Sequence, residues 1–157
     1  MSHPKRKTGL SSDTNILKAI EVVQGIINRI GRNSFLIKGW TITLVVITML
    51  LKGTDIQILI AFVPLFVFWY LDAYFLWQER MYRELYKWII TTKPIELETL
   101  FDMNAYRFES DVDSQLRIMR SKTLICFYGS VVILILLYAI ILPLVILLIQ
   151  EMVPNAV

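Results

Sequence analysis

Residues 56–77 read IQILIAFVPLFVFWYLDAYFLW and carry a single charge, that of Asp72. A helix of about 20 apolar residues crosses the hydrocarbon core of a bilayer and satisfies its own backbone hydrogen bonds there. Residues 39–51 and 123–149 form two further apolar stretches, and neither carries a charge. A chain of 157 residues that is 56% hydrophobic cannot bury this much apolar surface in water. The sequence therefore predicts an all-α membrane protein with three transmembrane helices.

The basic residues outside the apolar stretches predict the orientation of the spans. Residues 1–34 and 78–122 are rich in lysine and arginine, whereas neither residue type occurs beyond Lys122. Basic loops are retained on the cytoplasmic side of a membrane. We therefore expect a multi-pass membrane protein with its N terminus in the cytoplasm and its C terminus on the opposite side of the membrane.

The pattern of charge and hydropathy divides the chain into six segments. They are a disordered basic tail (1–12), an amphipathic cytoplasmic or interfacial helix (13–31), a transmembrane hairpin (34–78), a cytoplasmic stalk and cap (79–122), a third transmembrane helix (123–150) and an outer tail (151–157).

The second transmembrane helix should extend beyond the membrane. No glycine occurs between Ile56 and Ile90, and a helix of that length spans about 50 Å, more than the bilayer core of roughly 30 Å. It should therefore continue into the cytoplasm as the stalk, bend at Pro64 and end at Lys93-Pro94.

The amphipathic helix carries an apolar face at heptad-like spacing. Asp13 or Thr14 should cap its start, and Gly31 should end it. The apolar face is formed by Ile16, Ile20, Val23, Ile27 and Ile30. Two placements remain open for this helix: it lies in the membrane interface, or it packs against a second copy or against residues 78–122.

The segment between the stalk and the third span has weak periodicity. Residues 94–113 mix acidic and aromatic side chains, which indicates a small cap with one short strand or helix. Their carboxylates do not follow the spacing of a calcium loop, so a solvated acidic loop is the better interpretation. Residues 114–122 should form a helix that runs directly into the third span.

The chain lacks the residue patterns of an enzyme. His3 lies in the tail, Cys126 lies within the third span, and there is no glycine-rich phosphate loop or serine elbow. We predict no catalytic residue, no metal site and no cofactor.

A polar line on the first span is a candidate for the wall of a pore. Spacings of three and four residues place its members on one helix face. They are Lys38, Thr41, Val45, Thr48 and Lys52. A polar face within a membrane helix contacts either protein or water, and threonines flanked by lysines would favour anions. The alternative is that the threonines bond to their own backbone while the lysines mark the ends of the span.

Basic and aromatic residues alternate on the stalk and form a candidate site for an anionic ligand. The predicted anion-binding residues are Arg29, Arg32, Arg80, Arg83 and Lys87. Arginine binds phosphate through paired hydrogen bonds, and the interleaved aromatic rings can stack on bases. Anionic lipid headgroups would satisfy the same side chains, which is the alternative interpretation.

Asp72 is the charged residue within the apolar stretches. A carboxylate in that position must be paired, hydrogen-bonded or protonated. Because no second acid lies within the spans, an interhelical partner such as Lys38 is favoured over a proton relay.

Two strings, NSFLIKGW (33–40) and WYLDAYFLWQERMYRELY (69–86), resemble a family of small bacterial membrane proteins that share this hairpin-plus-span layout. Some proteins of this layout are membrane effectors of antiphage defence, among them channel-forming effectors of the Hailong type that respond to oligonucleotides or other nucleotide signals. The resemblance implies an oligomeric pore in the bacterial inner membrane that a cytoplasmic signal opens or holds shut. The C terminus would then lie in the periplasm.

These observations lead to two expected functions. The first is a homo-oligomeric, channel-like effector that depolarises the inner membrane when a nucleotide or short oligonucleotide binds on the cytoplasmic side. The second is a non-conducting membrane scaffold that binds a cytoplasmic protein through the amphipathic helix and residues 94–113. In both, the chain is embedded in the lipid bilayer.

Overall fold

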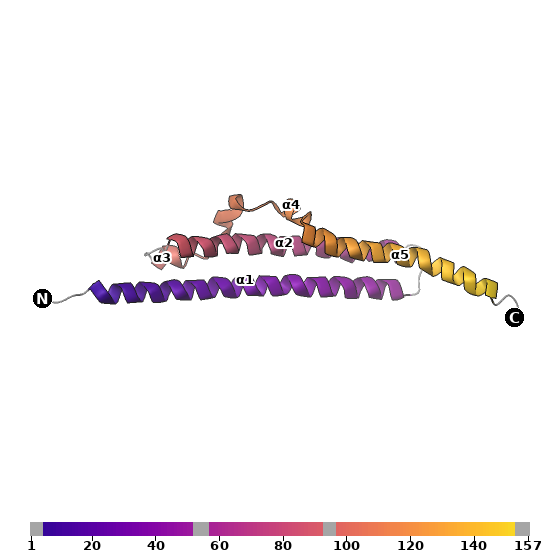
Figure 1. Ribbon diagram of the computed structural model, residues 1–157, viewed down its shortest axis with the longest axis horizontal. Coiled ribbons are helices and arrows are strands. Elements are labelled where there is room, and N and C mark those ends of the chain that lie inside the picture. The colour runs from indigo at the N-terminus through magenta and orange to yellow at the C-terminus, as the bar shows by residue number, and fades with distance from the viewer. Residues whose placement is uncertain (1–4, 52–56, 93–96, 153–157) are drawn as a thin grey trace. The chain divides into compact units, whose positions relative to one another are not determined.

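The computed structural model describes residues 5–51, 57–92 and 97–152, and these form helices joined by short irregular segments, with no strand among them. The helices are α1 (Lys5–Leu50), α2 (Gln57–Thr92), α3 (Leu97–Leu100), the 3₁₀ helix η1 (Ala105–Asp111), α4 (Gln115–Met119) and α5 (Lys122–Met152) (Figure 1).

Three of these helices are long and apolar enough to cross a membrane. They occupy Asp13–Leu50 within α1, Ile58–Thr92 within α2, and Lys122–Met152, which is α5. The all-α fold class and the number of potential transmembrane helices predicted from the sequence are therefore confirmed.

The expected end of the amphipathic helix at Gly31 is wrong, because α1 continues through this residue as one helix of 46 residues. A glycine within a helix costs roughly 1 kcal/mol relative to alanine. Packing on both sides offsets that cost, since Val23, Ile30 and Ile37 are all buried at heptad spacing. Residues 5–12, which we expected to be disordered, also belong to α1, and residues 1–4 lie outside the described part of the chain.

Helix α2 is continuous, as its lack of glycine predicts, and contains Pro64. Its 36 residues correspond to about 54 Å at the usual rise of an α-helix, more than the hydrocarbon core requires. A bend at Pro64 stays a prediction, and the expected stop at Lys93-Pro94 lies outside the described residues.

The chain folds into two compact units, and α1 and α2 each contribute residues to both. The first unit comprises residues up to Leu36 together with Asp72–Ile118, and the second comprises Ile37–Leu71 together with residues from Met119 onward.

The core of the first unit joins α1 to α2 and to the cap. Its buried members are Ala19, Val23, Met81, Leu85, Ile89, Leu100 and Ala105. The apolar face of the predicted amphipathic helix thus packs against residues 78–122, one of the two placements that the sequence left open. The described part of residues 94–113 contains two short helices, α3 and η1, rather than a single short element. A break at Arg120 and Ser121 separates α4 from α5, where we expected a continuous helix.

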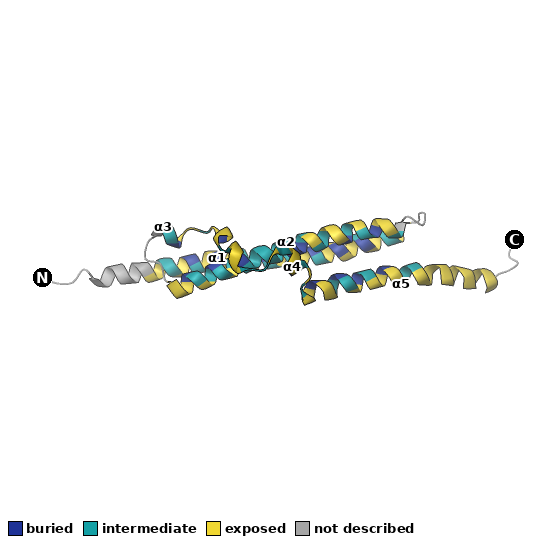
Figure 2. Ribbon diagram, turned by 90° about the horizontal axis from the view of Figure 1, so that it is seen from above, coloured by how far each residue is buried: buried dark blue, intermediate teal, exposed yellow. Residues whose placement is uncertain are grey.

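In the second unit, aromatic residues attach α2 to α5 and to Met119, the last residue of α4. The Trp69 and Tyr128 rings stack at 5.5 Å between centroids. The Tyr128 hydroxyl donates to the Phe68 carbonyl at 3.1 Å, and the Trp69 indole N–H donates to the Met119 carbonyl at 3.0 Å. Beyond Ala139 every described residue of α5 is exposed (Figure 2). This apolar surface suits contact with lipid.

Candidate functional site

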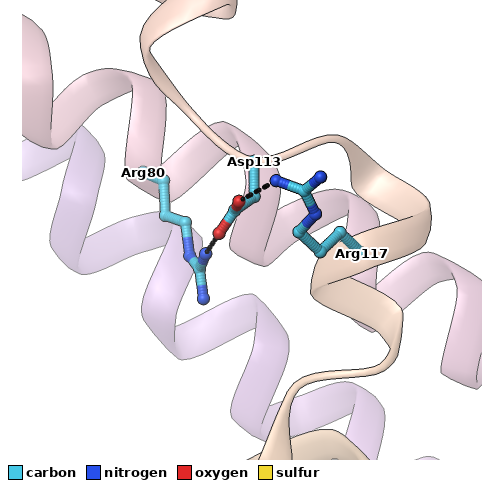
Figure 3. A network of polar contacts seen from close by, with 3 residues as sticks. All are labelled: Arg80, Asp113 and Arg117. Atoms are coloured by element: carbon cyan, nitrogen blue, oxygen red, sulfur yellow. Dashed lines mark hydrogen bonds and ion pairs between the residues drawn. The ribbon is translucent and has the colours of Figure 1, made fainter.

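Asp113 connects two arginines in the first unit. Arg80 on α2 donates from Nη1 to Oδ2 of Asp113 at 3.0 Å, and Arg117 on α4 donates from Nη1 to Oδ1 at 2.9 Å (Figure 3). Each carboxylate oxygen therefore accepts from a different guanidinium. The bridge ties α4, which directly precedes α5 in the chain, to the long helix α2.

The local sequence explains why Asp113 reaches both arginines. Asn104 caps η1 by accepting the Tyr106 amide at 3.2 Å, and η1 is followed by Val112, which has extended backbone angles (φ −117°, ψ 156°). The Ser114 carbonyl then accepts the amides of the first turn of α4. Asp113 thus precedes a helix and lies four residues before Arg117, the spacing at which side chains on one helix face meet.

The two arginines also determine the protonation of Asp113. The hydrogen bond from Arg117, reinforced by the positive charges of Arg117 and Arg80, lowers the pKa of Asp113 below its ordinary value of 3.8. The carboxyl is therefore ionised at neutral pH.

A cavity of about 430 Å³ opens beside this bridge, and we call it the arginine pocket. Its lining residues come from α2, the end of η1 and α4. They are Arg80, Arg83, Glu84, Ser110, Asp111, Val112, Asp113 and Arg117. Volumes of this size are common among small-molecule sites.

A second cavity of about 420 Å³ lies between α1 and α2 in the same unit. It is lined by Gln24, Ile27, Asn28, Arg83 and Tyr86. Arg83 therefore lines both cavities, while its guanidinium donates to Glu79 of the preceding turn.

The structure brings together two of the five predicted anion-binding residues, Arg80 and Arg83, in the arginine pocket. Lys87 is paired with Glu84 at 3.2 Å instead. Arg29 and Arg32 are exposed on α1, and the structure describes no ion pair or hydrogen bond for them. Their roles in ligand binding stay predictions.

Sequence reasoning expected Arg117 in the same cytoplasmic layer as Arg80, but it did not select Asp113 or pair it with Arg117. Their spacing of four residues, in a segment expected to be helical, is the signal that could have indicated the pair.

Arg107 is a further residue that the sequence did not single out. Its guanidinium carbon lies 4.2 Å from the centroid of the Trp88 ring and 5.0 Å from that of Phe108. It also pairs with Asp102 at 3.3 Å. The contact with Trp88 attaches η1 to α2.

The predicted pore-lining residues lie in the second unit, where the face that they share is largely covered. Thr41 is buried and donates to the Ile37 carbonyl at 2.8 Å, and Val45 is buried as well. Half-buried Thr48 donates to the Leu44 carbonyl at 2.7 Å. Both hydroxyls bond to their own helix backbone, as the alternative interpretation of this face proposed.

Of the two lysines predicted on the same face, the structure describes only Lys38. The Lys38 ammonium lies 5.9 Å from the centroid of the Phe127 ring, and Lys52 lies outside the described residues. A role of this face in conduction stays a prediction.

Asp72 is completely buried and accepts a hydrogen bond from the Ser34 hydroxyl on α1. The sequence predicted an interhelical partner for this carboxyl but did not identify Ser34. A contact between Asp72 and Lys38 stays a prediction.

Within the described part of the chain, no group of three or more histidine, cysteine or acidic side chains could hold a metal ion. The chain matches no protein-family model, no curated protein and no solved structure. Its function is therefore inferred from its own residues and their geometry.

Proposed function

We propose that the protein is an oligomeric, channel-like effector of the bacterial inner membrane, gated from the cytoplasm by a nucleotide or short oligonucleotide. The observation that carries this proposal is the continuity of α1 and α2, each of which contributes residues to both units without a break. Continuous helices can convey a displacement from a ligand site to a transmembrane segment. Depolarisation of the membrane in antiphage defence is the role that such an effector would serve.

The distribution of charge supports the orientation. The first unit contains most of the lysine and arginine residues of the chain, whereas the third span and the residues after it contain none beyond Lys122. By the positive-inside rule the first unit and the N terminus are cytoplasmic and the C terminus is periplasmic.

Conduction requires several copies of the chain, because three spans do not enclose a water path. The exposed apolar surface of α5 and the outer faces of α1 and α2 are available for such contacts and for lipid. In this proposal, the arrangement with Thr41 and Val45 packed inside the protomer is the closed state. Opening then requires α1 to turn or shift so that Thr41 and Thr48 contact water.

The chemistry of the gating ligand follows from the arginine pocket. Guanidinium groups bind phosphate through paired, charge-assisted hydrogen bonds. Arg80, Arg83 and Arg117 line one cavity, so a ligand that carries phosphate is the class that fits best.

A second candidate function is supported by one observation. On α1, Leu17 and Val22 are 60% and 47% exposed, in the unit assigned here to the cytoplasm. An apolar helix surface can receive a partner protein. A non-conducting scaffold would use this surface and would need no ion path.

Ion flux measured with purified full-length protein in liposomes distinguishes the two functions. For the channel, a short oligonucleotide present on the side of the arginine pocket should change the flux, and raised salt should weaken the effect because phosphate contacts release counterions. Liposomes without protein, and protein given the same mass of uncharged polymer, are the controls. An absence of flux across a range of nucleotides and oligonucleotides would favour the scaffold.

A further inference from the structure

We infer that the ligand of the arginine pocket carries a phosphate group, and that Asp113 is an internal anion which this phosphate must displace. This inference rests on the proposed function and specifies its ligand site. Asp113 occupies the position between Arg80 and Arg117 in which a phosphate would receive a hydrogen bond from each (Figure 3).

The two arginines have donors to spare for a larger anion. Each guanidinium gives one N–H to Asp113, and within the described residues neither guanidinium makes another hydrogen bond. A guanidinium has several N–H groups in one plane, which match two oxygens of a phosphate. A phosphate in place of the carboxylate would therefore gain bonds that Asp113 does not form.

The charge of the pocket allows a phosphate to replace Asp113. Three arginines and three carboxylates line the pocket, so displacement of Asp113 leaves one positive charge in excess. Arg83 is already engaged by Glu79, and Glu84 by Lys87. A phosphate group carries roughly −1.5 to −2 charge at pH 7, so a single group is enough to balance the charge that Asp113 leaves.

Displacement of Asp113 would change the attachment of the third span. Only Ser114 separates Asp113 from α4, and only Arg120 and Ser121 separate α4 from α5. With Asp113 in place, α4 is tied to α2 through Arg80. Binding of the ligand would break that tie, and the segment that enters α5 would be held by the ligand instead.

The test compares two variants of full-length protein in phosphatidylcholine nanodiscs, titrated with inorganic tripolyphosphate by calorimetry. Asp113→Asn removes the internal anion. Asp102→Asn is the matched control, because it also replaces one paired carboxylate in the same unit, that of the Arg107 pair, outside the pocket lining. We expect Asp113→Asn to bind about five-fold more tightly than wild type, since partly exposed ion pairs are individually weak. Asp102→Asn should bind like wild type.

A lipid headgroup could present the same phosphate chemistry, and a second set of nanodiscs distinguishes the source. Discs that contain phosphatidic acid will lower the affinity of every variant for tripolyphosphate through general repulsion, which leaves the ratio between Asp113→Asn and wild type unchanged. If a headgroup occupies the pocket, it displaces Asp113 already and this ratio falls to one. Either result supports displacement of Asp113, the first by a soluble ligand and the second by a lipid.

Equal affinity of wild type, Asp113→Asn and Asp102→Asn in phosphatidylcholine discs would overturn the inference. Flux that responds to an oligonucleotide, with the same half-maximal concentration in Asp113→Asn, would also overturn it and leave the channel function intact. Tighter binding by Asp113→Asn without flux under any condition would support the pocket and refute the channel.

Discussion

The guanidinium of Arg107 lies over the ring of Trp88, with 4.2 Å between the guanidinium carbon and the ring centroid. This contact joins the 3₁₀ helix η1 to α2, so it connects the wall of the arginine pocket to the stalk. Exchange of Trp88 for leucine keeps an apolar side chain but removes the π face, which is worth about 0.5–1 kcal/mol at such a site. We expect faster hydrogen exchange in residues 105–111 of Trp88→Leu. Unchanged exchange there would show that η1 is held by other contacts.

The bridge between α2 and α4 should depend on pH. Arg117 and Arg80 lower the pKa of Asp113 in the folded protein below 3.8, so this carboxyl stabilises the fold above its unfolded pKa and loses that effect as pH falls through the lower, folded pKa. Protection factors of α4 amides should therefore be constant down to about pH 4 and fall below it. The same measurement on Asp113→Asn should give lower protection at neutral pH and no such step.

Ser34 and Asp72 form a buried pair whose partners depend on each other. Removal of the hydroxyl in Ser34→Ala leaves a buried carboxyl without this donor, which should cost about 1–3 kcal/mol. In the double variant Ser34→Ala with Asp72→Leu the acid itself is gone, so the loss should be smaller than the sum of the single losses. Unfolding of detergent-solubilised protein measures all four members of the cycle. Strict additivity would mean that the two side chains do not interact.

Substitutions of the threonines of α1 test the proposed ion path. Thr48→Val keeps the shape of a half-buried side chain and removes a hydroxyl that bonds to the Leu44 carbonyl. If Thr48 contacts water in the open state, Thr48→Val should reduce ion flux several-fold while the oligomer remains intact by size-exclusion chromatography.

Thr43→Val is the matched control, because Thr43 also bonds to its own backbone but lies on an exposed face of α1. A reduction of flux by Thr43→Val and not by Thr48→Val would place the path on the other side of the helix.

At the expected outer mouth, Lys52→Glu should shift selectivity towards cations, since it reverses the sign of a charge near the path.

The orientation can be tested by fusions after Val157. A periplasmic reporter should be active there and a cytoplasmic reporter inactive, because three spans place the two termini on opposite sides. An active cytoplasmic reporter at this position would require an even number of spans in the membrane.

The sequence predicted the spans and the continuity of α2 because both depend on local composition. Long charge-poor runs have few alternatives to a membrane helix, and α2 contains no glycine. The end at Gly31 was wrong because the local signal of a glycine is weaker than the packing of Val23, Ile30 and Ile37 on either side of it.

The site was harder to predict than the spans, because its contacts join distant parts of the chain. Arg80 could be selected from the stalk pattern, but its partner Asp113 lies in a cap without clear periodicity. Ser34 could not be predicted as the partner of Asp72, because a serine beside a predicted span can bond to many groups and only the fold brings its hydroxyl to this carboxyl.

Because α1 is one unbroken helix, the direction of each of its side chains around the helix axis is set by the number of residues that precede it. Each residue of an α-helix advances by about 100°, so one residue inserted between Ile30 and Ile37 would rotate everything beyond it by more than a quarter of a turn. No loop within α1 can absorb such a change. Lengthening α1 is therefore tolerable only in steps near whole numbers of turns, and insertions of one and of seven residues at this place should have very different consequences.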